Sequence, residues 1–100
     1  MPSPKTKRVK LLKFTSKGCQ PCKAMLPILA KFKKAHPEVE IIEIDVNGDR
    51  VEENLVAKYD VTCVPTFIFI NSKGKRLWSI EGVCSLLNLE SSLNGSLKLG

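Results

Sequence analysis

Residues 9–37 read VKLLKFTSKGCQPCKAMLPILAKFKKAHP, and this stretch decides the fold. It opens with a short run rich in apolar residues, 9–14, which is typical of a strand. The polar, glycine-containing turn 15–18 follows. After this turn, apolar residues recur every three or four positions, as in a helix, to the end of the stretch. The sequence therefore predicts that a strand delivers Cys19-Gln20-Pro21-Cys22 to the first turn of a helix.

Downstream, the pattern alternates between strand and helix periodicity. The segment 39–46 is mostly apolar and rich in β-branched residues, as in a strand covered on both faces. Strands joined through a helix are expected to run parallel with a right-handed crossover, whereas the short turn 71–74 makes the last two strands antiparallel. The order βαβαββα indicates an α/β fold with a mixed four-stranded sheet flanked by helices. We predict strands at 9–14, 39–46, 65–70 and 75–81 and helices at 19–35, 49–59 and 85–94.

The length of 100 residues indicates one domain, residues 1–100. We expect residues 1–7 to be a flexible basic N-terminus and residues 95–100 a flexible tail.

The longest uninterrupted apolar run, 67–70, is far shorter than the roughly 20 residues of a membrane span. No secretory signal peptide is recognised either. The expected location is therefore cytoplasmic, without a membrane partner.

Charge is distributed unevenly along the chain. There are 16 Lys and Arg against 10 Asp and Glu, a formal net charge of +6. Residues 1–37 carry ten of the basic residues and no acid, whereas residues 38–60 carry eight of the acids. A basic segment can bind nucleic acid or steer an acidic partner, but this one lacks the interleaved aromatics of a single-strand binder. Ordinary solvated lysines are the simpler interpretation, so nucleic acid is not an expected partner.

Four cysteines stand at positions 19, 22, 63 and 84. Without a secretion signal, their even number does not indicate a disulfide framework. A four-cysteine zinc site is an alternative, but Cys63 and Cys84 do not form the second close pair, and His36 is the only histidine. No metal site is therefore expected. A Cys-x-x-Cys near a strand-helix-strand pattern is typical of a redox pair.

Several further residues form a pattern with the cysteine pair: Phe14, Cys19-x-Pro21-Cys22-Lys23, Pro27, Asp45-Val46, Val64-Pro65-Thr66, Gly74 and Gly82. Taken together, these residues resemble the thioredoxin family over about residues 8–94. The resemblance implies a minimal thioredoxin fold, a cis peptide between Val64 and Pro65 and a helix kinked at Pro27. It also implies a thiol–disulfide oxidoreductase, a protein-disulfide reductase whose redox-active disulfide Cys19–Cys22 takes the place of a cofactor.

The chain departs from the family pattern at several positions. Gly18 stands where the family usually has Trp, and Gln20 where it usually has Gly. Lys13 replaces the buried Asp that assists proton transfer in the family. The N-terminal strand and helix of longer members are also expected to be missing, since only 18 residues precede Cys19.

Thiolate chemistry assigns different roles to the two cysteines. At a helix N-terminus and near several lysines, Cys19 is expected to ionise more readily than an ordinary cysteine and to act as the nucleophile. Cys22, one turn further, is expected to be buried and to resolve the mixed disulfide. Lys13, Glu43 or water is expected to take over proton transfer. A buried Lys13 would favour a neutral amine that could act as a base; alternatively, its ammonium extends to solvent.

We expect a target peptide to lie beside the residues that precede Pro65 and to be recognised mainly through its backbone. Cys63 is expected to be an inert or half-exposed thiol and Cys84 a core residue. The expected partners are disulfide-containing proteins and an electron-donor reductase of unknown type, and the chain is expected to be a monomer. The predicted substrate-binding residues are Gly18, Gln20, Pro21, Cys63, Val64, Pro65 and Gly82.

Two other classes of function remain open from the sequence. One is a different redox protein, glutaredoxin-like or of the oxidase or isomerase type. Pro21 within the pair resembles the reducing members, because isomerases usually have His in the dipeptide. The other is a binding module that keeps the fold without turnover, and the two intact cysteines argue against it.

Overall fold

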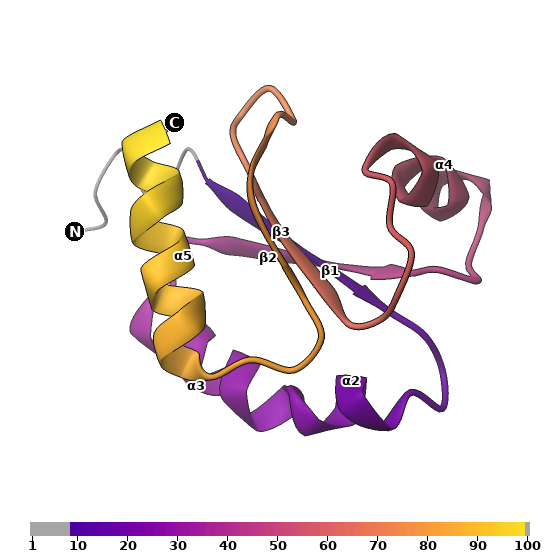
Figure 1. The fold of residues 1–100 in the computed structure, drawn as a ribbon, viewed down its shortest axis with the longest axis horizontal. Helices are drawn as coiled ribbons and strands as arrows, with labels where there is room; N and C mark the ends of the chain where they lie inside the picture. Colours follow the sequence, from indigo (N-terminus) through magenta and orange to yellow (C-terminus); the bar gives the residue numbers. More distant parts are fainter. Residues whose placement is uncertain (1–8, 100) are drawn as a thin grey trace.

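The computed structural model describes residues 9–99, in which helices cover both faces of a four-stranded sheet (Figure 1). The order of elements is the predicted βαβαββα, with the first helix in two pieces. The expected flexible segment 1–7 lies outside the described residues. In chain order the elements are β1 (Lys10–Thr15), α2 (Gln20–Ala24), α3 (Leu26–Ala35), β2 (Glu40–Asp45), α4 (Arg50–Lys58), β3 (Thr66–Ile70), β4 (Arg76–Glu81) and α5 (Leu86–Leu99).

The strands lie in the order β2-β1-β3-β4. β1 and β2 are parallel, and β3 is antiparallel to both of its neighbours, β1 and β4. The prediction of a mixed four-stranded sheet is therefore confirmed.

The direction predicted for the third strand was wrong, because β3 does not run parallel to the two strands before it. A parallel crossover requires the connecting helix to carry the chain back along the sheet. α4 has nine residues and spans only about 13 Å. It stays near the end of the sheet at which β2 finishes, and the chain re-enters the sheet from that same end (Figure 1).

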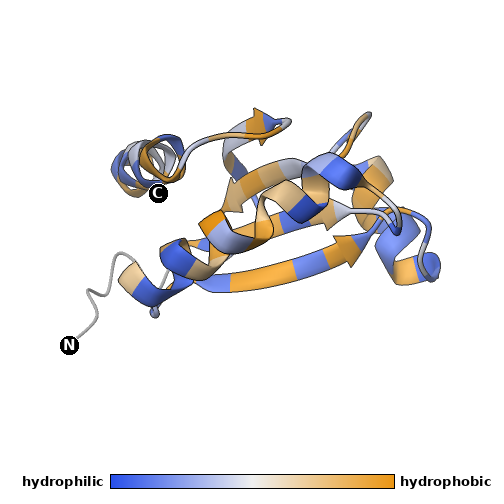
Figure 2. Ribbon diagram, turned by 90° about the horizontal axis from the view of Figure 1, so that it is seen from below, coloured by the Kyte–Doolittle hydropathy of each residue, from blue (hydrophilic) through white to orange (hydrophobic). Residues whose placement is uncertain are grey.

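Two clusters of buried apolar side chains lie on opposite faces of the sheet. Because side chains alternate along a strand, Phe67 and Phe69 of β3 pack with α3 and α5, whereas Ile68 and Ile70 pack with residues of α4. All five residues of β3 are buried. Hydrophobic colour is accordingly prominent along the strands, and hydrophilic colour lies on the outer sides of the helices (Figure 2).

β2 is more exposed than its composition suggested. We expected a strand covered on both faces, but β2 lies at the edge of the sheet and only Ile44 is buried. Its register with β1 places Lys10 opposite Glu40, with 3.6 Å between the ammonium and the carboxylate. Lys13 lies opposite Glu43 in the same way, at 3.4 Å. Opposite charges on facing residues favour this register, since a slip of one residue would separate both pairs.

The first helix is interrupted at Met25, two residues before Pro27, the position at which the resemblance implied a kink. Pro27 has no N–H to donate to the carbonyl of Lys23, so one helical hydrogen bond cannot form. Met25 ends α2, and its N–H donates to the carbonyl oxygen of Cys22 at 3.2 Å. The break separates the short helix that holds the cysteines from α3, which packs on the sheet.

The last helix extends to Leu99, so the predicted helix end at 94 and the predicted flexible tail were wrong for residues 95–99. A Gly in this position often ends a helix, but Gly95 lies inside α5 against the ring of Trp78. A Cβ at position 95 would come within 2.8 Å of the ring atom Cζ3. Ser96 is fully buried, and its hydroxyl donates to the carbonyl of Ser92 at 2.7 Å. Gly95 thus allows α5 to approach β4 closely and to continue past the predicted end.

The packing of α5 can be tested with two leucines on the same helix. Leu89→Ala removes a fully buried side chain, and we expect it to lower the free energy of unfolding by about 2–5 kcal/mol. Leu87 is 71% exposed and serves as the matched control, because Leu87→Ala should change that free energy by less than about 0.5 kcal/mol. Urea unfolding followed by circular dichroism measures both variants. Equal losses would contradict the docking of α5 on the sheet.

Candidate active site

Cys19 stands at the junction between β1 and α2. The connecting turn is closed by the N–H of Cys19, which donates to the carbonyl of Ser16 at 3.3 Å. Gly18 has a φ of +78°, a left-handed conformation that a bulky residue adopts only with strain. This explains why glycine suits the position in this chain. The predicted strand–turn–helix placement of the pair is confirmed.

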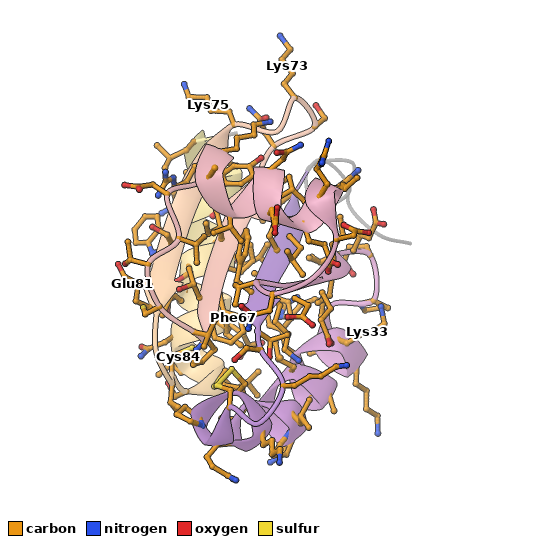
Figure 3. The ribbon with its side chains drawn as sticks, turned by 90° about the vertical axis from the view of Figure 1, so that its right-hand side faces the viewer. Lys33, Phe67, Lys73, Lys75, Glu81 and Cys84 are labelled. Atoms are coloured by element: carbon orange, nitrogen blue, oxygen red, sulfur yellow. A yellow bond between two sulfur atoms is a disulfide. The ribbon has the colours of Figure 1, made fainter. Side chains whose placement is uncertain are left out.

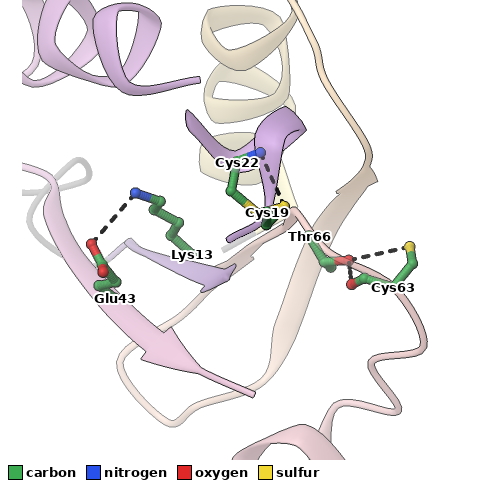
Figure 4. Close-up of a disulfide and its surroundings, with 6 residues drawn as sticks. All are labelled: Lys13, Cys19, Cys22, Glu43, Cys63 and Thr66. Carbon is green, nitrogen blue, oxygen red and sulfur yellow. Dashed lines mark hydrogen bonds and ion pairs between the residues drawn. A yellow bond between two sulfur atoms is a disulfide. The ribbon is translucent and has the colours of Figure 1, made fainter. Parts of the chain in front are cut away.

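Cys19 and Cys22 form a disulfide in the structure, with their Cα atoms 5.2 Å apart (Figure 4). Cys19 caps the start of α2, and its Sγ accepts a hydrogen bond from the backbone N–H of Cys22 at 3.1 Å. Cys22 is only 4% exposed, whereas Cys19 is half-buried. A partner can therefore reach the first sulfur more easily than the second.

Lys13 and Glu43 lie in the same cavity as the cysteine pair. This cavity has a volume of about 150 Å³ and includes Cys19, Cys22 and Lys23 in its lining. Lys13 is 5% exposed, and its Nζ donates to Oε2 of Glu43 at 3.4 Å (Figure 4). The side chain of Glu43 is 66% exposed. The stem of the lysine is thus buried, and its ammonium is paired with a carboxylate at the protein surface.

A second part of the site is the segment before β3. The peptide bond between Val64 and Pro65 is cis, as the resemblance implied. The carbonyl of Pro65 accepts a hydrogen bond from the N–H of Gly82 at 2.8 Å. Pro65 and Gly82, both predicted as substrate-binding residues, are therefore held side by side.

Cys63 is an exposed free thiol, whereas the sequence led us to expect an inert or half-exposed one. Its Sγ donates to Oε2 of Glu81 at 3.1 Å, a contact that the sequence did not reveal. The hydroxyl of Thr66 donates to the carbonyl of Cys63 at 2.7 Å. Cys63 points away from the disulfide in Figure 4. The Cys63 thiol is therefore hydrogen-bonded to Glu81 and is directed away from Cys19 and Cys22.

Cys84 is buried, as predicted. It belongs to the cluster of apolar side chains between the sheet, α3 and α5. Its backbone N–H donates to the sulfur of Met25 at 3.4 Å. Burial raises the pKa of the Cys84 thiol, because the thiolate loses solvation there. Cys84 therefore stays protonated to higher pH than a solvated cysteine.

Two further observations concern only residues 9–99. No three side chains of His, Cys, Asp or Glu in this range are grouped so that they could hold a metal ion. None of the helices in this range has the length and apolar character needed to cross a membrane.

Comparison with known proteins points to one family. The family profile described as Thioredoxin matches residues 4–95. A thioredoxin H-type from Picea mariana is 34% identical over 77 residues, which are 77% of this chain and 58% of that protein. Thioredoxin-1 from Caenorhabditis elegans is 33% identical over 75 residues, which are 75% of this chain and 62% of that protein. The chain thus spans less than two thirds of the length of these two relatives.

Solved structures of similar proteins share the same arrangement of elements. The X-ray structure of Fasciola hepatica thioredoxin has a TM-score of 0.75 and 31% sequence identity, and the match covers 90% of this chain and 82% of that one. The thioredoxin of Trypanosoma brucei brucei has a TM-score of 0.78 and 26% identity, with coverage of 94% and 79%. The similarity therefore extends over most of the described sheet and helices.

The two free thiols should differ in reactivity. With the Cys19–Cys22 disulfide intact, iodoacetamide at pH 8 is expected to alkylate Cys63 and to leave Cys84 unmodified. Exposure favours the first reaction, while burial and the raised pKa disfavour the second. Mass spectrometry of the native and the urea-unfolded protein measures this, and both thiols should react after unfolding. Equal alkylation of the two in the native protein would show that Cys84 is accessible.

Proposed function

Because the chain belongs to the thioredoxin family, we propose that it is a thiol–disulfide oxidoreductase that reduces disulfide bonds in other proteins. The observation that carries the proposal is the unequal exposure of two bonded cysteines at the start of a helix. In the reduced protein, the N–H of Cys22 is placed to donate to the Cys19 thiolate. Cys19 is then the nucleophile, and Cys22 is the resolving thiol.

The reaction takes place in two exchanges. The thiolate of Cys19 attacks one sulfur of the target disulfide, which forms a mixed disulfide and releases the other target sulfur as a thiolate. The thiolate of Cys22 then attacks Sγ of Cys19, which forms the Cys19–Cys22 bond and releases the first target sulfur. The target gains two electrons, and the protons of the two cysteines end on its thiols. The second exchange is fast because Cys22 is held next to Cys19.

Lys13 and Glu43 are proposed to assist the second exchange. Cys22 must lose its proton in a buried position, where an unpaired thiolate is unfavourable. The Lys13 ammonium lines the same cavity and stabilises a negative charge there. Glu43 contacts this ammonium and is exposed to solvent, so it can pass the proton of Cys22 to water. This pair takes the place of the carboxylate that the family usually has at position 13.

The target is proposed to bind as an extended segment beside the cis peptide bond. Among the backbone hydrogen bonds outside helices and strands in residues 9–99, none uses Val64. The N–H and carbonyl of Val64 are therefore free to pair with the backbone of a target. The surface proposed to contact the target consists of Gly18, Gln20, Pro21, Cys63, Val64, Pro65 and Gly82.

A donor must reduce the Cys19–Cys22 disulfide after each turnover, and we propose that a separate reductase supplies the electrons. The exposed free thiol of Cys63 supports a reducing compartment, for which we propose the cytoplasm. The chain is proposed to act as a monomer.

The assignment of the two cysteines can be tested by substitution. With dithiothreitol as donor, Cys19→Ser should reduce insulin disulfides no faster than dithiothreitol alone, since the accessible thiol of the pair is lost. Cys22→Ser should still attack and should accumulate as a mixed disulfide with the target, visible by mass spectrometry. Cys84→Ala is the control, because Cys84 lies in the core and outside the proposed machinery. Full activity of Cys19→Ser, or a mixed disulfide through Cys63, would refute the assignment.

The role of Lys13 can be tested against a matched lysine. Lys13→Met should slow the second exchange by about tenfold or more at neutral pH, with a smaller effect as the pH rises and Cys22 ionises unaided. Lys10→Met is the control, because Lys10 lies on the same strand and pairs with Glu40 in the same way, but it does not line the cavity of the cysteine pair. Stopped-flow measurement of target release over a range of pH reports the effect.

Glu43→Gln extends this test. It should also slow the second exchange, but less than Lys13→Met, because water can still accept the proton. The same pH–rate profile for the native protein and Lys13→Met would show that Lys13 has only a structural role.

A further inference from the structure

A groove extends from the cysteine pair along the side of α3 that faces the edge strand β2. It consists of two neighbouring cavities, the one of about 150 Å³ beside Cys19 and a second of about 320 Å³. The two cavities share Lys13, Leu26 and Glu43 in their linings. We call the combined depression the α3–β2 groove. The second cavity is lined by Lys13, Leu26, Leu29, Ala30, Lys33, Ile41 and Glu43.

The groove combines aliphatic side chains with a lysine at each end, and the Lys13–Glu43 ion pair lies where its two cavities meet. Leu26 is 52% exposed and lines both cavities. Lys23 lines the cavity nearest the disulfide and Lys33 lines the far one, and both are exposed. The only carboxylate in the lining is that of Glu43, which is paired with Lys13. The groove therefore has two lysines that no carboxylate of its lining neutralises.

The helical side of the groove has the same sign of charge, while Glu40 and Glu43 on the β2 side are paired with Lys10 and Lys13. Residues 16–37 contain no acidic residue, and their five lysines are all exposed. Figure 3 places Lys33 at the right-hand side of the molecule, away from Lys73 and Lys75 at its top. A partner that approaches the disulfide from this side meets positive charge along the whole helix, which favours an acidic partner.

We propose that the α3–β2 groove binds an extended segment of the target protein in which acidic and aliphatic residues alternate next to the target disulfide. The carboxylates of this segment pair with Lys23 and Lys33, and its aliphatic side chains cover Leu26. This inference rests on the proposed function, because it names the class of target that the cysteine pair reduces. The groove is separate from the surface proposed around Val64 and Pro65, since neither residue lines it.

An acidic peptide fits the groove better than a nucleic acid does. A single strand of nucleic acid binds by stacking its bases on aromatic side chains, and the lining of the groove contains none. Its lining includes the aliphatic residues Leu26, Leu29, Ala30 and Ile41, which suit leucine or valine side chains. The two lysines at its ends can neutralise separate carboxylates.

The experiment compares two peptides, each with the same internal disulfide, that differ only in the flanking segment. One segment alternates Glu with Leu, and the other alternates Gln with Leu. The fully reduced protein is mixed with each peptide, and the rate constant of disulfide reduction is measured at low and high salt. We expect the Glu peptide to react faster by roughly two- to fivefold at low salt and the difference to disappear at high salt.

Two adjacent lysines provide a matched pair of variants. Lys33→Glu should remove the preference for the Glu peptide and leave the rate for the Gln peptide unchanged. Lys34→Glu changes the net charge by the same amount, and Lys34 is an exposed residue of the same helix that does not line the groove. This variant should therefore keep most of the preference for the Glu peptide. Equal effects of the two variants would mean general charge steering and would overturn the proposal, as would equal rates for the two peptides.

A binding measurement separates this proposal from the redox function. A cysteine-free Glu-Leu peptide is titrated into isotopically labelled oxidised protein, and NMR shifts are followed. Shifts at Leu26, Ala30 and Lys33 that are absent in Lys33→Glu support the groove even if no disulfide is reduced. The absence of such shifts overturns the proposal even if reduction is normal. A single-stranded oligonucleotide that shifts the same residues and displaces the peptide would also overturn it, in favour of a nucleic-acid site.

Discussion

The burial of β3 on both faces is the constraint on which the rest of the structure depends. All five of its residues are buried, so apolar side chains leave the strand in both directions and each face needs a cover. α3 and α5 supply one cover and α4 the other. β3 begins directly after Pro65, and its neighbour β1 ends just before the turn to Cys19. The two parts of the candidate site are therefore held by the same pair of central strands.

Features that depend on neighbouring residues in the chain could be predicted from the sequence. The start of the helix at the cysteine pair, its break before Pro27 and the mixed sheet follow from local patterns and the family resemblance. The direction of β3, the exposure of β2 and the continuation of α5 could not be predicted. Each depends on contacts between segments far apart in the sequence. Gly95 illustrates this, because its proximity to Trp78 outweighs its usual tendency to end a helix.

The same distinction applies to the candidate site. Cys19 and Cys22 are recognisable from their spacing, because their chemistry requires them to be close in the chain. Lys13 and Glu43 could only be suggested, since their contact requires the register between β1 and β2. The hydrogen bond between Cys63 and Glu81 could not be predicted from the sequence, because it depends on the pairing of β4 with β3. The pairing of His36 with Glu90, at 2.8 Å, likewise joins two helices whose docking the sequence did not reveal.

The contact between Trp78 and Gly95 has a practical consequence. The chain has one tryptophan, and its indole ring lies against the backbone of the final helix. Tryptophan fluorescence therefore originates from a single place, the contact between an edge strand and that helix. A change in emission will accompany detachment of the C-terminal segment, so a spectrometer can follow this local opening without any added dye.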